Sequence, residues 1–208
     1  MSIDSLYLSH SIKLDFMRHG ETELSHTLRG STDDALTSNG QAQMQRTLEQ
    51  AIQSNVHWDV IFTSPLKRCH VFAKHAAEQL KLDIHCLSEL QEMHFGDWEA
   101  KTTQYLYDTV PEQLEKFWLY PTEFSPPNAE TLVQLETRIE EALGQIRCVM
   151  QQNSYSRALV VSHGGVIKLL KCKALKKPLN DLLKMSAELG QLNHFSYIHA
   201  NELVYEEG

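Results

Sequence analysis

The sequence predicts an α/β fold: a single-domain, three-layer α/β/α sandwich with a mostly parallel sheet. Strand-like segments alternate along the chain with amphipathic segments that have helical periodicity. Three of the strand-like segments end at loops that carry polar residues. Hydrophobic residues fill 42% of the 208 positions, which is enough to bury a sizeable core. We therefore expect one domain over residues 1–208.

The first strand is expected at residues 12–16, where apolar and polar residues alternate. It runs into a loop with the sequence Arg18-His19-Gly20. A first helix is expected over residues 41–54, because the preceding Thr37-Ser38-Asn39-Gly40 is typical of a helix start.

The second strand is expected at residues 60–62, where three large apolar residues follow one another. Ser64 and Pro65 come directly after it. Serine is a favoured helix N-cap, and proline suits the first helical position. We therefore expect a helix that begins at Pro65 and reaches about Leu80.

The second half of the chain has a long helix and three more strands. The helix is indicated by apolar residues at steps of three and four, namely Leu132, Leu135, Ile139, Leu143, Ile146 and Val149. A strand at residues 158–161 leads through Ser162-His163-Gly164-Gly165 into a helix at residues 166–170. Residues 193–200 and 202–205 are expected as strands at or near a sheet edge.

Charge and cysteine content exclude several classes of protein. The 19 Lys and Arg against 27 Asp and Glu give a net charge of -8, which argues against a nucleic-acid or anionic-membrane partner. No segment approaches the roughly 18 apolar residues of a membrane span, and no Lys or Arg precedes Lys13, so we expect a cytoplasmic protein. Cys69, Cys86, Cys148 and Cys172 lack zinc-site spacing and are expected to be buried free thiols.

The polar residues at the strand ends predict a binding site. Ligands of open α/β sheets bind beyond the carboxyl ends of the strands, so Arg18, His19, Arg68 and His163 should gather there. Two guanidinium groups and two imidazoles favour an anion, and the planar arginine fork matches the oxygens of a phosphate. Neither GxxxxGK[ST] nor GxGxxG is present, which excludes both common nucleotide-phosphate loops.

Five blocks of residues stand out between Leu14 and about Leu170. They are Arg18-His19-Gly20-Glu21-Thr22, Leu36-Thr37-x-x-Gly40-Gln41-Ala42, Ser64-Pro65-Leu66-Lys67-Arg68, Glu92-Met93-His94-Phe95-Gly96-Asp97-Trp98-Glu99 and Ser162-His163-Gly164-Gly165. In type and order they resemble the histidine phosphatase superfamily, which includes cofactor-dependent phosphoglycerate mutase. The resemblance implies a phosphoglycerate mutase-like fold and a phosphoric monoester hydrolase that needs no metal and no cofactor.

The resemblance also implies a role for each site residue. His19 would be the nucleophile that forms a phosphohistidine, and the charges of Arg18 and Arg68 would lower its pKa from about 6.5. Both arginines and a protonated His163 would hold the phosphate oxygens. Glu92 would be the proton donor and acceptor, because a carboxyl that faces a phosphate dianion favours its protonated form.

Two further residues are expected to bind substrate, and one of them departs from the family pattern. Gly164 follows His163 at the start of a predicted helix. Ser25 stands six residues after the nucleophile, where the family usually has asparagine. The serine hydroxyl is shorter than an asparagine amide but can still donate a hydrogen bond.

The resemblance places a helical specificity insertion at about residues 100–130. This part of the chain is rich in aromatic residues, namely Tyr105, Tyr107, Phe117, Trp118, Tyr120 and Phe124, and residues 121–128 are expected to be an irregular loop. The favoured interpretation is that the rings pack two short helices onto the domain. The competing interpretation is a lid whose rings contact an aromatic part of the substrate, with Phe95 and Trp98 lining the pocket.

The block at residues 90–99 most resembles bacterial α-ribazole phosphatases, which act in cobalamin biosynthesis. The implied substrate is α-ribazole 5'-phosphate, a small phosphate ester. The sequence is also compatible with a broad sugar-phosphate or nucleotide phosphatase, with a phosphoglycerate mutase and with a phosphate-recognising binding module without turnover. The oligomeric state is not predicted.

Overall fold

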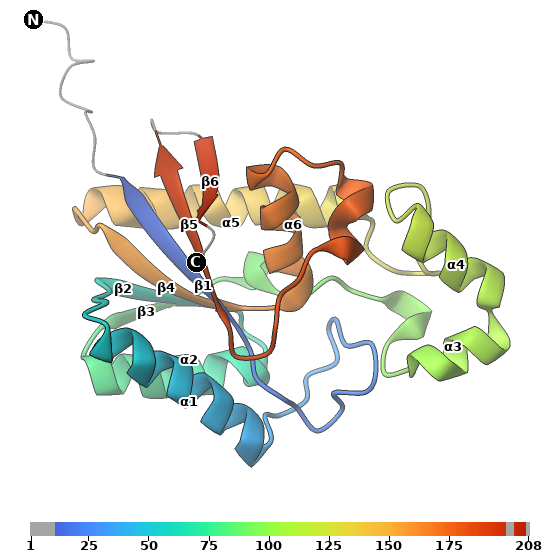
Figure 1. Ribbon diagram of the computed structural model, residues 1–208, viewed down its shortest axis with the longest axis horizontal. Coiled ribbons are helices and arrows are strands. Elements are labelled where there is room, and N and C mark those ends of the chain that lie inside the picture. The colour runs from blue at the N-terminus through green and yellow to red at the C-terminus, as the bar shows by residue number, and fades with distance from the viewer. Residues whose placement is uncertain (1–10, 199–201, 207–208) are drawn as a thin grey trace, which may run out of the picture.

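The computed structural model describes residues 11–198 and 202–206, and within them it contains one six-stranded sheet in the order β3-β2-β4-β1-β5-β6 (Figure 1). The strands are β1 Ile12–Arg18, β2 Val60–Thr63, β3 Asp83–Cys86, β4 Arg157–Ser162, β5 Leu192–Ile198 and β6 Glu202–Glu206. The pairings of β1 with β4, β2 with β4 and β2 with β3 are parallel, whereas β5 and β6 pair antiparallel. The predicted mostly parallel sheet is confirmed.

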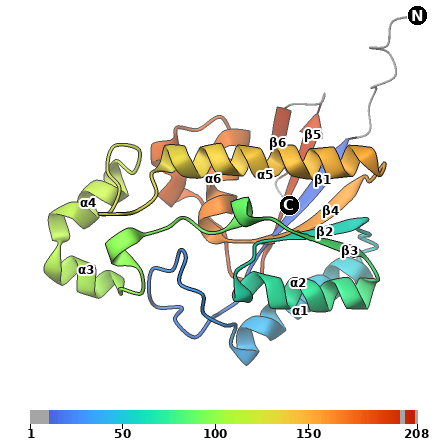
Figure 2. The same cartoon turned by 180° about the vertical axis from the view of Figure 1, so that it is seen from behind.

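Helices cover both faces of the sheet. They are α1 Ser38–Gln53, α2 Lys67–Leu80, α3 Thr103–Thr109, α4 Pro111–Leu119, α5 Leu132–Gln152 and α6 Gly164–Ala174, with short 3-10 turns at 88–90, 96–98 and 179–184. In Figures 1 and 2, α1 and α2 lie below the sheet, and α5 and α6 lie above it. This arrangement is the predicted three-layer sandwich.

The strands separate two hydrophobic cores because their side chains alternate between the two faces. Along β4, Ala158 and Val160 face the core that α5 and α6 close, while Leu159 and Val161 face the core of α1 and α2. All four side chains are fully buried, as expected for a central parallel strand. Buried faces on both sides hold β1, β2 and β4 in one register, and this register positions the loops at their ends.

The start of α2 differs from the prediction. The helix begins at Lys67, not at Pro65, and its N-cap Leu66 makes no side-chain capping hydrogen bond. Ser64 is fully buried, and its hydroxyl lies 2.8 Å from Nε2 of His163. The same hydroxyl accepts from the N–H of Leu66 at 3.3 Å, so the serine closes a turn before the helix and also contacts the strand-end cluster. The predicted end at Leu80 is correct.

The sequence did not predict β3, and the prediction of buried cysteines is correct for only two of the four. The β3 strand is short, lies at the sheet edge and contains no buried residue, so it lacks the apolar pattern of the other strands. The prediction of buried thiols is correct for Cys69 and Cys172 and wrong for Cys86 and Cys148, which are exposed. The C-terminal strands lie where expected, although residues 199 and 200 of the first one fall outside the described part of the chain.

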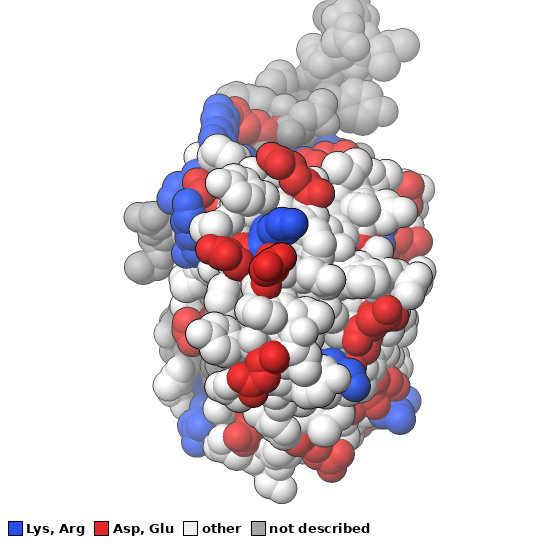
Figure 3. Space-filling model, turned by 90° about the vertical axis from the view of Figure 1, so that its right-hand side faces the viewer, with Lys and Arg blue, Asp and Glu red and all other residues white. Residues whose placement is uncertain are grey.

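The segment expected as an insertion contains α3 and α4, which stand beyond the end of the sheet (Figure 1). Trp98 packs edge-on against Phe117 at a ring-centroid distance of 5.6 Å and also contacts Phe124, so these rings belong to the core. By contrast, four aromatic side chains of the segment are exposed, namely Tyr105, Tyr107, Trp118 and Tyr120. Acidic side chains are more widespread than basic ones on this end of the molecule (Figure 3).

Within residues 11–198 and 202–206, no helix is both long enough and apolar enough to cross a membrane.

Candidate active site

Parallel register brings three strand ends to one edge of the sheet. Arg18 at the end of β1 pairs with Ser162 at the end of β4, and Thr63 at the end of β2 pairs with Val161. The residues that follow these ends are therefore neighbours. The rings of His19 and His163 lie 5.3 Å apart between centroids in an edge-on arrangement.

The hydrogen bond of His19 defines its tautomer. Nδ1 lies 2.8 Å from the carbonyl oxygen of Gly20, and a carbonyl oxygen only accepts. Nδ1 therefore carries the proton, and Nε2 keeps its lone pair. Burial, together with the positive charges of Arg68, Arg18 and Arg29, lowers the pKa of His19 to about 3, although the Gly20 hydrogen bond acts in the opposite direction. The neutral imidazole that a nucleophile requires is thus favoured.

The contacts of His163 favour a neutral imidazole and do not support the expected protonated form, and its protonation state with phosphate bound stays a prediction. Nε of Arg68 donates to Nδ1 of His163 at 3.3 Å, and Nε2 of His163 therefore carries the proton and faces the Ser64 hydroxyl at 2.8 Å. Burial and the nearby charge of Arg68 hold the pKa of His163 well below its usual range. A second proton would have to share this enclosed space with a guanidinium group.

Arg18 points toward the start of α6 and the loop before β5. One of its terminal nitrogens donates to the carbonyl oxygen of Ala187 at 2.5 Å. Its Nε is buried and has no hydrogen-bond partner among the described residues. Gly164 allows this approach, because a Cβ there would lie 3.1 Å from the guanidinium carbon. Arg18 therefore brings a partly unsatisfied cation to the N-terminus of a helix, where backbone N–H groups also favour anions.

Arg68 is fully buried and organises the loop before α1. Its five acceptors are Nδ1 of His163, Oδ1 of Asp34 and the carbonyl oxygens of Arg29, Gly30 and Thr32. The ion pair with Asp34 spans 3.3 Å between two almost completely buried side chains. In this arrangement the guanidinium holds the loop against His163, and direct phosphate binding by Arg68 stays a prediction.

The Glu92 carboxylate lies against the first turn of α6. Its Oε2 accepts from the N–H of Gly165 at 2.9 Å, and its Oε1 accepts from the N–H of Met93 at 2.9 Å. A Cβ at Gly165 would lie 2.3 Å from Oε1, so only glycine admits the carboxylate there. The neighbouring Glu99 instead binds backbone N–H groups of the 30–32 loop. Geometry thus separates two acids that sequence spacing alone leaves equivalent.

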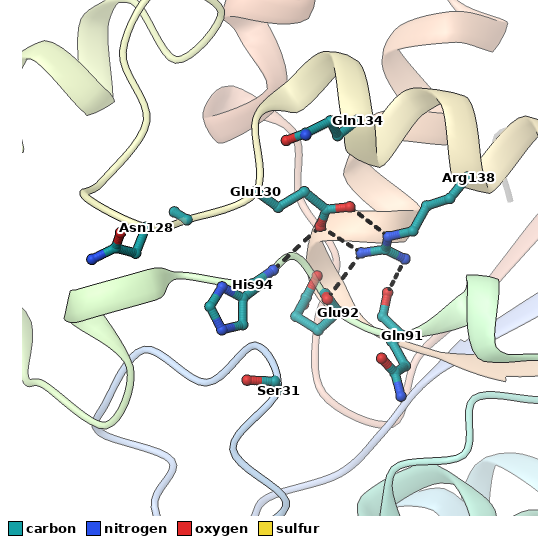
Figure 4. Close-up of a pocket in the computed structure, with 9 residues that line it drawn as sticks. Ser31, Gln91, Glu92, His94, Asn128, Glu130, Gln134 and Arg138 are labelled. Atoms are coloured by element: carbon teal, nitrogen blue, oxygen red, sulfur yellow. Dashed lines mark hydrogen bonds and ion pairs between the residues drawn. The ribbon is translucent and has the colours of Figure 1, made fainter.

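Glu92 also borders a cavity of about 560 Å³ that is lined mainly by residues with polar side chains (Figure 4). The lining residues are Ser31, Gln91, Glu92, His94, Asn128, Ala129, Glu130, Gln134 and Arg138. Arg138 pairs with Glu130 at 2.6 Å and donates to the carbonyl oxygens of Gln91 and Glu92, which fixes this wall. None of the aromatic side chains at residues 105–124 lines the cavity.

Ser25 is exposed and closes a turn near the nucleophile. Its hydroxyl oxygen accepts from the N–H of Thr22 at 2.8 Å. The hydroxyl can still donate its own proton, so its place in the phosphate site stays a prediction.

Two cations that sequence reasoning missed lie beside the predicted residues. Arg29 is 8% exposed at its side chain and pairs with Asp34 at 3.4 Å. Lys168 is half-buried on α6, four residues after Gly164, and burial and the nearby Arg18 lower its pKa. The helical spacing of Lys168 was a usable signal because residues four apart share a helix face. Arg29 lies in an irregular loop without periodicity, so no pattern pointed to it.

No group of three or more His, Cys, Asp or Glu side chains within the described ranges is arranged to hold a metal ion.

Sequence comparisons identify relatives over most of the chain. It is 33% identical over 156 residues to the uncharacterized phosphatase PhoE of Bacillus subtilis (strain 168), covering 74% of this chain and 72% of that protein. It is 26% identical over 184 residues to the adenosylcobalamin/α-ribazole phosphatase of Escherichia coli (strain K12), covering 86% and 87%.

Structural comparisons show the same fold in two solved phosphatases, which confirms the predicted phosphoglycerate mutase-like architecture. The α-ribazole phosphatase of Shigella flexneri matches with a TM-score of 0.79 at 24% identity, covering 94% of this chain and 95% of that one. A mycobacterial glucosyl-3-phosphoglycerate phosphatase with inorganic phosphate matches with a TM-score of 0.79 at 20% identity, covering 94% of each. The model of the histidine phosphatase superfamily (branch 1) matches residues 14–205, so the chain belongs to that superfamily and is a phosphatase.

Proposed function

We propose that this phosphatase hydrolyses a small-molecule phosphate monoester through a phosphohistidine at His19. The observation that carries the proposal is the neutral His19 imidazole, whose Nε2 lone pair is free beside a cluster of arginines. An unprotonated nitrogen among positive charges suits attack on an anionic phosphorus centre.

The proposed reaction has two displacement steps. In the first, Nε2 of His19 forms a bond to phosphorus while the bond to the ester oxygen breaks, and Glu92 transfers a proton to that oxygen. In the second, water attacks phosphorus, Glu92 takes one of its protons, and the bond to His19 breaks to release phosphate. Arg18 and Arg68 are proposed to stabilise the charge on the transferring group.

The remaining predicted residues complete the proposed phosphate site. Ser25 and the N–H of Gly164 are proposed to donate to phosphate oxygens. His163 is proposed to contact the same phosphate oxygens, next to His19. Arg18 and Arg68 together with these donors supply the positive potential that a metal ion provides in other phosphatases, so activity in a chelator is part of the proposal.

We propose α-ribazole 5'-phosphate, in cobalamin biosynthesis, as the specific substrate. The support comes from two relatives named adenosylcobalamin/α-ribazole phosphatase, from Escherichia coli and Salmonella typhimurium, at 26% and 29% identity over 184 residues. A broad sugar-phosphate phosphatase is the second candidate. It is favoured by the cavity beside Glu92, whose polar lining residues offer hydrogen bonds to hydroxyl groups and include no aromatic ring from the insertion, although His19 is not one of the lining residues.

A substrate panel tests both candidates. Phosphate release is measured from α-ribazole 5'-phosphate, sugar phosphates, nucleotides and p-nitrophenyl phosphate, in chelator and with His19→Ala as the control. We expect the highest kcat/KM for α-ribazole 5'-phosphate and no release by His19→Ala. A higher kcat/KM for sugar phosphates would select the second candidate, and equal release by His19→Ala would refute the nucleophile.

A mutase and a non-catalytic binding protein would each give a distinct result with the same substrates. A phosphoglycerate mutase would isomerise phosphoglycerate faster than it releases phosphate. A binding module would retain phosphate esters without turnover, which would contradict the proposed function. Recovery of lost activity by magnesium after chelation would contradict the metal-independent mechanism.

A further inference from the structure

Arg29 is a nearly buried cation in the loop between β1 and α1. Its guanidinium charge acts on His19, on Arg18 and on Arg68, so it lies within electrostatic reach of these three residues. Its Nε is buried and has no hydrogen-bond partner among the described residues. A buried donor without an acceptor is costly, and such a group in a phosphatase site indicates an acceptor that the protein itself does not supply.

Hydrogen bonds hold Arg29 in place through both its backbone and its side chain. The backbone oxygen of Arg29 accepts from Arg68 at 3.3 Å, and the N–H of the next residue, Gly30, donates to Glu99 at 3.0 Å. One terminal nitrogen of the side chain donates to the Thr22 hydroxyl and to Asp34. These contacts use the backbone and one terminal nitrogen of the guanidinium group. Nε remains a buried donor without a hydrogen-bond acceptor among the described residues. This is the arrangement of a preorganised ligand-binding arginine.

The local charge balance is positive. Asp34 pairs with both Arg29 and Arg68, so one carboxylate serves two guanidinium groups. Arg18 adds a third guanidinium and Lys168 adds an ammonium group, and both are influenced by Glu92 and Glu188. Four positive charges therefore face three negative ones, which leaves one positive charge for a bound anion. The buried, unpartnered Nε of Arg18 is a second donor in the same cluster.

We propose that Arg29 is a third arginine of the phosphate site and donates from Nε to a nonbridging oxygen of the phosphoryl group. The inference rests on the proposed phosphatase site at His19 and extends it to a residue outside the sequence motifs. The simpler explanation is that Arg29 only pairs with Asp34 to hold the loop. The two roles differ in what they do to phosphate affinity in a folded protein.

The test compares three variants with the natural protein. Arg29→Gln removes the charge, Arg29→Lys keeps the charge without the planar fork, and Arg46→Gln changes an exposed arginine on α1 as the control. The measurements are the Kd of inorganic phosphate by calorimetry, kcat/KM for p-nitrophenyl phosphate and the thermal unfolding temperature. We expect about a tenfold weaker phosphate Kd for Arg29→Gln, the loss of one charge-assisted hydrogen bond, and a smaller loss for Arg29→Lys. Arg46→Gln should match the natural protein.

A folded Arg29→Gln with unchanged phosphate Kd would overturn the inference, even if its unfolding temperature falls. If Arg29→Gln fails to fold, Arg29→Lys decides, and unchanged phosphate affinity there overturns the inference as well. A natural protein that binds phosphate but hydrolyses no ester would instead refute the proposed function. The two failures are thus distinguishable.

Discussion

A single hydrogen bond determines which nitrogen of His19 is available for chemistry. The Gly20 carbonyl oxygen accepts from Nδ1, and this leaves Nε2 as the nitrogen that keeps its lone pair. The neighbouring His163 is held in the opposite tautomer because Arg68 donates to its Nδ1. Two histidines at equivalent strand ends therefore have different hydrogen-bonding roles, and their partners, not their sequence context, assign those roles.

The tautomer and pKa of His19 can be measured directly. Burial lowers the pKa to about 3, so the ring should stay neutral between about pH 8 and pH 4, whereas an ordinary imidazole protonates near about 6.5. Heteronuclear NMR of the imidazole nitrogens should show a proton on Nδ1 and no titration over that range. His19→Ala assigns the signals. A midpoint near neutrality would contradict the neutral nucleophile.

Gly165→Ala should displace the Glu92 carboxylate with little change in the stability of the protein. The new Cβ would lie 2.3 Å from Oε1 at the flexible end of Glu92, which can swing away at little cost in stability. We expect kcat/KM to fall about 100-fold for an alkyl phosphate, whose leaving oxygen needs a proton, and less for p-nitrophenyl phosphate. Equal losses for both substrates would contradict the role of Glu92 as proton donor.

The matched control for this variant is Gly144→Ala on α5, where an added Cβ meets nothing within 4 Å. Its activity should be unchanged. Its free energy of unfolding should rise by up to about 1 kcal/mol, because alanine is the better helix former.

At the scale of elements, the sequence predicts best where one pattern decides the structure. The α5 helix was predictable because its apolar spacing coincides with its buried face and a capping box at Thr131 and Gln134 starts it. The β3 strand was not, since an edge strand without buried residues carries no alternation. The start of α2 was placed two residues too early because the Ser64 hydroxyl closes a turn with the N–H of Leu66 before the helix begins. Its contact with His163 is a long-range one that local capping rules do not describe.

The same distinction applies to the site. Arg18 ends β1, and His19 and His163 directly follow β1 and β4, so topology alone predicts that they meet. Arg29 reaches the cluster from an irregular loop, and its position depends on hydrogen bonds to residues distant in sequence, such as Glu99 to Gly30. Those bonds become visible only in three dimensions.

The 29–34 loop should depend on Glu99, which joins it to the segment at residues 94–99. The carboxylate accepts hydrogen bonds from the backbone N–H groups of Gly30, Ser31, Thr32 and Phe95. Glu99→Gln loses the charge and one acceptor, so we expect a loss of about 1–3 kcal/mol in the free energy of unfolding by urea. Glu78→Gln, at an exposed position of α2, is the control and should change nothing. Equal stability of both variants would contradict this role.

At the scale of the molecule, buried Asp15 joins elements from across the sheet. It lies on β1, 1% exposed, and accepts from Trp58, from Arg157 on β4 and from His194 on β5, each at 2.7 Å. Burial would raise the pKa of Asp15, but the hydrogen bonds from His194 and Arg157 outweigh it, so the pKa is lowered overall. The folded state therefore favours the ionised carboxylate.

This lowered pKa predicts how stability changes in acid. A carboxyl whose pKa is lower in the folded state stabilises the fold above its unfolded pKa of about 3.9, and this contribution is lost as the pH falls through the folded pKa. Asp15→Asn should therefore lower the free energy of unfolding by about 3 kcal/mol at neutral pH, because it leaves Arg157 without its carboxylate, and by less below about pH 4. Urea unfolding at several pH values measures the difference, with Asp83→Asn on exposed β3 as the control. If the loss in the free energy of unfolding caused by Asp15→Asn is the same at neutral pH and below about pH 4, then packing, not charge, makes Asp15 necessary to the fold.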